Sequence, residues 1–148
     1  MAPITTTTEV ARPPEEVFAY ATDPTRFVEW QRNVVGGHMD TQGPINVGTT
    51  CLTTRRIGFA ERAVTSEVTH INPPETWGVR GIDGPIRAIV NVTVAPLDEG
   101  RRSRLTTELD FEGHGIGTLL VPLGVRKQAS KEMPANLQTL KERLEDRK

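Results

Sequence analysis

The sequence contains a single cysteine, Cys51, among its 148 residues, so no disulfide can form within the chain. This excludes the disulfide-rich scaffolds of small secreted proteins and favours a reducing compartment, for which we expect the cytoplasm. Aromatic residues are also scarce, at 5% of the chain, and 36% of the residues are hydrophobic. With few large side chains to fill it, the interior can keep a cavity.

Long hydrophobic runs and a dominant charge are missing as well. No stretch approaches the roughly 20 apolar residues that a membrane-spanning helix needs. Residues 1–10 are rich in threonine, which is unlike a signal peptide. The 18 basic and 19 acidic residues give a formal net charge of −1, with no basic excess to attract nucleic acid or an anionic membrane. We therefore expect a soluble protein, monomeric or homodimeric, with no nucleic-acid partner and no membrane insertion.

Recognisable catalytic and metal-binding motifs are absent from the sequence. The three histidines, His38, His70 and His114, lie far apart and lack the spacing of metal ligands. No nucleophile-elbow, zinc-protease or phosphate-loop motif occurs. We expect no metal and no cofactor.

The N-terminal part predicts one strand and two short helices. Alternation and β-branching indicate a strand at Ile4–Val10. Pro13-Pro14-Glu15-Glu16 has the proline and acidic residues of a first helical turn. A second helix should begin at Pro24 with Asp23 as its N-cap, and it places Phe27 and Trp30 on one face.

The middle of the chain reads as a meander of strands separated by tight turns, such as Asn72-Pro73-Pro74 and Asp98-Glu99-Gly100. A weak strand at Val34–Met39 comes first. Five stronger strands are then predicted at Gly48–Ile57, Phe59–Ile71, Thr76–Gly81, Ile86–Ala95 and Ser103–Gly113.

From Ile116 onward the apolar period changes from two residues to that of a helix. Met133, Leu137, Leu140 and Leu144 fall on one helical face. Pro134 removes one backbone hydrogen bond, so we expect a kink in this helix without a break. The fold class is therefore α+β: a seven-stranded curved antiparallel sheet, in the order β-α-α-β6-α, around a long C-terminal helix. We expect residues 1–148 to form a single domain with a ligand cavity between sheet and helix.

Several local strings, in this order along the whole chain, resemble the helix-grip (SRPBCC) superfamily, which includes START and birch-pollen-allergen-like proteins. They are Ala11 to Phe18, Thr22-Asp23-Pro24 through Trp30, Glu67-Val68-Thr69 with Pro73-Pro74, and Asn136-Leu137 with Leu140-Lys141. The resemblance is greatest to the polyketide cyclase/dehydrase-like branch. It implies a cavity for a hydrophobic ligand but no particular reaction, since a fold does not fix a function.

Two functions follow from this sequence. The first is binding of a small hydrophobic or amphipathic molecule, such as a lipid or polyketide, without catalysis. The alternative is a cyclase, aromatase or dehydratase acting on polyketide-like substrates. Because the sequence has no clear acid–base pair, binding is the stronger hypothesis. An interaction with another protein has no support in the sequence.

The candidate catalytic residues are His70 and Arg56, each on the assumption that a regular strand turns it inward. His70 shares its parity with Val68, and Arg56 shares its parity with Leu52. The alternative is that His70 is a hydrogen-bonded histidine of the core or rim and that the Arg55-Arg56 pair is solvated at a hairpin end. The predicted ligand-binding residues are Trp30, Leu52, Val68, His70, Trp77, Val79, Val90, Leu109, Phe111, Leu120 and Met133.

Overall fold

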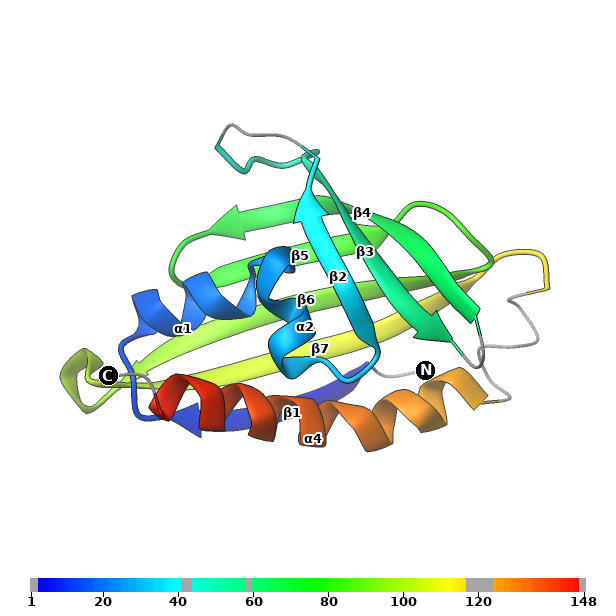
Figure 1. Ribbon diagram of the computed structural model, residues 1–148. Helices are drawn as coiled ribbons and strands as arrows, with labels where there is room; N and C mark the ends of the chain where they lie inside the picture. Colours follow the sequence, from blue (N-terminus) through cyan, green and yellow to red (C-terminus); the bar gives the residue numbers. More distant parts are fainter. Residues whose placement is uncertain (1–2, 41–43, 58–59, 117–123, 147–148) are drawn as a thin grey trace.

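The computed structural model describes residues 3–40, 44–57, 60–116 and 124–146. A curved antiparallel sheet of seven strands wraps around one long helix, as Figure 1 shows. The strands are β1 (Ile4–Val10), β2 (Val34–Met39), β3 (Thr50–Ile57), β4 (Ala60–Asn72), β5 (Thr76–Gly81), β6 (Ile86–Leu97) and β7 (Arg102–Gly113). The helices are α1 (Pro14–Ala21), η1 (Pro24–Arg26), α2 (Phe27–Trp30), η2 (Asp98–Gly100) and α4 (Arg126–Glu145). This architecture confirms the predicted fold class.

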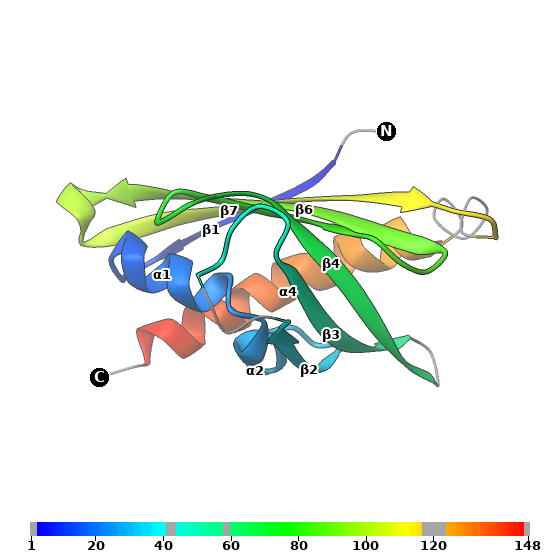
Figure 2. The same cartoon turned by 90° about the horizontal axis from the view of Figure 1, so that it is seen from above.

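The sheet order is β1-β7-β6-β5-β4-β3-β2, so only β1 is displaced from its place in the chain order. It pairs with β7, whereas β2 to β7 form the expected meander. Seen from above in Figure 2, β3 and β4 bend away from the plane of β6 and β7, and α4 runs along the hollow face. The inner face of the sheet therefore meets the helix.

The short helical segments pack on the sheet at different places, α1 against β6 and β7, and η1 and α2 against β2. Asp23 caps η1 through its carboxylate, which accepts a hydrogen bond from the Thr25 backbone N–H at 3.0 Å, as predicted. The η1 segment packs closely on β2, where a Cβ on Gly37 would lie 2.7 Å from the carbonyl oxygen of Pro24. Glycine at this position lets the two backbones approach.

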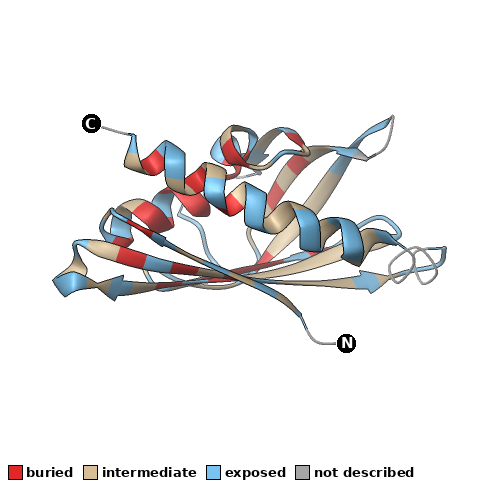
Figure 3. Cartoon of the chain, turned by 90° about the horizontal axis from the view of Figure 1, so that it is seen from below, coloured by how far each residue is buried: buried red, intermediate tan, exposed pale blue. Residues whose placement is uncertain are grey.

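The C-terminal half of α4 anchors the core. Leu137, Leu140 and Leu144 are 3%, 0% and 0% exposed, so each contributes about 1.5–3 kcal/mol by burial. The helix continues through Pro134, as expected, and it approaches β1 and α2 most closely. In Figure 3 the buried positions of α4 gather toward its C-terminal end.

The last turn of α4 is tied to the corner between β1 and α1. Arg12 donates to the carbonyl oxygens of Leu144 and Glu145, at 2.9 and 3.2 Å. The Glu145 carboxylate accepts from the backbone N–H of Ala11 and from Lys141, each at 2.8 Å. These bonds fix the C-terminal end of the helix against the sheet.

Candidate functional site

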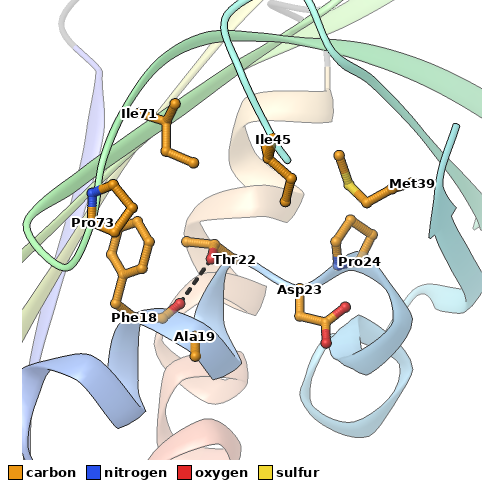
Figure 4. A pocket seen from close by; sticks show the side chains of 9 residues that line it. All are labelled: Phe18, Ala19, Thr22, Asp23, Pro24, Met39, Ile45, Ile71 and Pro73. Atoms are coloured by element: carbon orange, nitrogen blue, oxygen red, sulfur yellow. Dashed lines mark hydrogen bonds between the residues drawn. The ribbon is translucent and has the colours of Figure 1, made fainter. Parts of the chain in front are cut away.

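A mostly apolar cleft of about 400 Å³ opens at the α1 end of the molecule (Figure 4). It lies between α1, η1, the end of β2 and the turn from β4 to β5. Its lining residues are Phe18, Ala19, Thr22, Asp23, Pro24, Met39, Ile45, Ile71 and Pro73.

The polar groups of this cleft already have partners within the protein. The Thr22 hydroxyl donates to the Phe18 carbonyl at 2.8 Å, and the Asp23 carboxylate accepts from Thr25. Among the described residues, the lining holds no histidine, cysteine, lysine or arginine. Apolar contact is therefore the main interaction that the cleft offers.

A second hollow, of about 450 Å³, is lined by Arg26, Glu29, Arg143 and Asp146. All four side chains are charged. This surface is suited to water and ions and does not fit an apolar molecule.

The inner face of the sheet changes in burial along the strands. On β6, Val92 and Val94 are 3% and 2% exposed, whereas Ala88 and Val90, on the same face, are only partly buried. On β7, Leu105 is fully buried and further along the same face Leu109 and Phe111 are partly buried. We call the four partly buried positions Ala88, Val90, Leu109 and Phe111 the open half of the inner face.

Within the open half, Ala88 of β6 lies opposite Phe111 of β7, and Val90 lies opposite Leu109. The N-terminal half of α4 is correspondingly less buried than its C-terminal half, with Met133 partly buried. Apolar side chains thus face the helix without being fully covered. Such a surface fits an apolar ligand better than it fits water.

One arginine belongs to the inner side of β3. Cys51 and Thr53 are 3% and 5% exposed, and Arg55 has the same parity along the strand. The Arg55 guanidinium donates to the side-chain oxygen of Gln31 at 3.2 Å. Burial lowers the pKa of Arg55, and electrostatic interactions with Cys51 and Glu132 act in the opposite direction.

The N-terminal half of α4 carries a carboxylate near this arginine. Glu132 accepts hydrogen bonds from the side-chain amides of Asn33 and Gln128. Asn136, one turn later, accepts from the Arg32 backbone N–H at 3.1 Å. The helix is therefore attached to the segment that follows α2, directly beside Gln31.

The prediction that His70 points inward is wrong. The register of β4 against β5 shifts between Val68 and His70, which is the mark of a β-bulge. The bulge moves His70 to the outer face, where its Nε2 lies 2.8 Å from the Asn91 side-chain oxygen. The imidazole of His70 crosses over Gly78, where an added Cβ would lie 2.3 Å from His70 Nε2. In this arrangement His70 does not face α4 and cannot contact a ligand bound on the inner face of the sheet.

The inward direction assumed for Arg56 is also wrong. Its side chain is 64% exposed and pairs with Glu61 at 3.4 Å, on the outer face. Leu52 shares that face, because it alternates with the buried Cys51 and Thr53. The adjacent Arg55 has the inward position instead.

The other predicted ligand-binding residues fall into three groups. Trp30, Val68, Trp77 and Val79 are buried in the core. Val90, Leu109, Phe111 and Met133 are partly buried at the open half or on the helix above it. Leu120 lies outside the described residues. None of the described members lines the cleft at α1. Their role in binding stays a prediction.

The described residues form neither a metal-binding cluster nor a membrane-spanning helix. Over the described ranges, no group of three or more histidine, cysteine or acidic residues is placed to hold a metal ion. Within the same part of the chain, no helix is long and apolar enough to span a membrane.

Solved structures with the same fold cover nearly the whole chain. The Zhui aromatase/cyclase from Streptomyces sp. R1128 is 14% identical, with 97% of this chain and 93% of that chain aligned at a TM-score of 0.79. TTHA0849 from Thermus thermophilus is 18% identical, with 96% of both chains aligned at a TM-score of 0.75. A START superfamily protein from Mycobacterium smegmatis is 15% identical, with 98% of both chains aligned at a TM-score of 0.72. Likeness at these identities shows the fold alone.

A comparison of this sequence with curated proteins found no match. A family model does match, over residues 1–145, and its description is polyketide cyclase / dehydrase and lipid transport. The match spans the sheet, both short helices and α4. The chain belongs to this family.

Proposed function

We propose that the protein binds one small hydrophobic or amphipathic molecule, lipid- or polyketide-like, between the sheet and the N-terminal half of α4. The observation that carries the proposal is the partial burial of Ala88, Val90, Leu109 and Phe111, whereas Val92, Val94 and Leu105 on the same face of the same two strands are buried. Covering this apolar surface with a ligand would contribute roughly 25 cal/mol per Å² of area removed from water. The family description, which includes lipid transport, supports the same class of ligand.

Binding is favoured over catalysis by the positions of His70 and Arg56, the two candidate catalytic residues. A cyclase or dehydratase needs a proton donor or acceptor within reach of its substrate. His70, the candidate for that role, lies on the outer face, bonded to Asn91. Arg56 lies on the outer face as well, paired with Glu61.

Two matched substitutions locate the ligand. Ala88→Phe fills the open half with a phenyl group, and Ala19→Phe adds the same group at the cleft beside α1. The uncharged probe N-phenyl-1-naphthylamine reports binding by fluorescence, and lipids and aromatic polyketides are then tested as competitors. We expect Ala88→Phe to raise the dissociation constant of the probe at least about tenfold and Ala19→Phe to leave it unchanged.

The opposite pattern would place the ligand in the cleft and overturn the proposed location. If the wild-type protein binds neither the probe nor any competitor, the proposed function itself is wrong. Thermal unfolding of each variant controls for loss of the fold.

A further inference from the structure

Arg55 has more hydrogen-bonding capacity than the protein uses. A guanidinium carries five N–H donors in a planar fork and no acceptor. In the described part of the chain, its hydrogen-bond partner is one neutral amide oxygen, that of Gln31 at 3.2 Å. Most of the fork therefore remains available to another group.

The charge of Arg55 is offset by Glu132 through space and not through a direct contact. Among the described residues it forms no ion pair, whereas its neighbour Arg56 pairs with Glu61. Glu132 lies near enough to influence it, but the oxygens of that carboxylate accept from Asn33 and Gln128. A partly buried cation without an anionic partner is unfavourable unless something else pairs with it.

The position of Arg55 brings its guanidinium close to the proposed ligand site. It lies on the inner side of β3, next to the segment where Asn33 joins α4. The strands β3 and β4 bend away from the plane of β6 and β7, which carry the open half, and α4 runs between the two parts of the sheet (Figure 2). A ligand under the N-terminal half of α4 thus has apolar strands on one side and a guanidinium on the other.

A second donor lies on the same segment. Trp30, directly before Gln31, is 9% exposed, and its indole Nε1 is buried without a hydrogen-bond partner among the described residues. Buried N–H groups are nearly always paired in folded proteins. Trp30 thus adds an unpaired donor to the segment whose next residue, Gln31, accepts from Arg55.

We propose that Arg55 binds the carboxylate of an organic acid whose apolar body lies on the open half of the inner face. The inference rests on the proposed function, which it narrows from apolar molecules in general to apolar carboxylic acids. A carboxylate is the best match for the guanidinium fork, because its two oxygens accept two parallel N–H bonds.

The test compares two ligands with the same naphthalene body, the anion 2-naphthoate and the neutral 2-naphthamide, by isothermal titration calorimetry. We expect the wild-type protein to bind 2-naphthoate at least about tenfold more tightly than 2-naphthamide, since a charge-assisted pair is stronger than a neutral one. Arg55→Gln should abolish this preference while keeping the affinity for the amide. Arg56→Gln, the same change at the adjacent exposed position, should preserve the preference.

The outcomes separate this inference from the proposed function. Equal binding of the two compounds by the wild-type protein, or a preference that survives in Arg55→Gln, overturns the role of Arg55 and leaves the proposed function standing. Binding of neither compound counts against the proposed function, and the inference falls with it. If Arg55→Gln fails to fold, Arg55→Lys decides: it keeps the charge but not the fork, so a reduced preference supports the inference and an unchanged one overturns it.

Discussion

At the scale of single residues, the contact between His70 and Asn91 shows why Gly78 is a glycine. The imidazole of His70 passes over the middle of β5 to reach Asn91 on β6. A Cβ at Gly78 would stand 2.3 Å from His70 Nε2 and 2.8 Å from Asn91 Oδ1. Both distances are shorter than a van der Waals contact, so no side chain fits beneath the hydrogen bond.

We predict that Gly78→Ala lowers the free energy of unfolding by about 1–3 kcal/mol, because the imidazole must move and lose its bond to Asn91. In the His70→Ala variant, Gly78→Ala should lower the free energy of unfolding by about 1 kcal/mol less than in the wild type, because the imidazole that crowds the new Cβ is absent. Urea denaturation of the two single variants and the double variant measures the difference. Gly36→Ala is the matched control, because nothing lies within 4 Å of a Cβ there. Additive effects of the two substitutions would show that the contact is unimportant.

Residue parity is also where prediction from the sequence fails. Counting alternate residues from apolar neighbours places both His70 and Arg56 inward. For His70 the count is broken by the bulge after Val68, and nothing in the sequence marks that bulge. For β3 both faces carry polar residues, so its threonines and arginines offer no apolar row to count from. The inward position of Arg55 is therefore visible only in the structure.

At the scale of elements, Glu145 joins the last turn of α4 to the start of α1. Its carboxylate is bonded to Lys141, at 2.8 Å, and to the backbone N–H of Ala11, also at 2.8 Å. The bond to Lys141 and then that to Ala11 hold the pKa of Glu145 below its ordinary value of 4.5. In the unfolded chain this pKa returns to the ordinary value, so the folded state favours the ionised form.

The sign of the pH dependence follows from this depressed pKa. The stabilisation by Glu145 is complete above the unfolded value of 4.5 and is lost as the pH falls through the lower folded value. We predict that Glu145→Gln is less stable than the wild type at neutral pH and that the difference shrinks in acid. Urea denaturation across this pH range measures it. Glu142→Gln, on the same helix and without an ion pair among the described residues, should show no such trend. A difference that stays constant with pH would contradict the prediction.

The predicted elements are largely those observed, because strong local signals define them. Pro14 and the Asp23-Pro24 cap fix the two short helices, and alternation fixes β6 and β7. The long helix is marked by its row of leucines, which are buried as expected. The cleft at α1 has no such signal, because Phe18, Met39 and Ile71 come from elements far apart in the sequence. Their meeting depends on how η1 packs on β2.

At the scale of the whole molecule, the two halves of α4 differ. The C-terminal half is held by three buried leucines and by the bonds from Arg12 and Glu145. The N-terminal half has no fully buried residue from Arg126 to Asn136, and Pro134 removes a backbone bond within it. Local stability follows burial and hydrogen bonding, so the N-terminal half should open more easily.

Hydrogen exchange measured by mass spectrometry tests both this difference and the ligand site. In the free protein we predict faster exchange for residues 126–133 than for residues 137–144. Adding N-phenyl-1-naphthylamine should slow exchange in the N-terminal half of α4 and leave α1 and the turn from β4 to β5 unchanged. A ligand bound beneath the helix stabilises the closed state by its free energy of binding. Local opening of the helix must then break these ligand contacts, so exchange becomes slower. Protection of α1 and that turn instead would move the site to the apolar cleft. Equal exchange of the two halves before ligand is added would show that the three leucines stabilise the helix along its whole length.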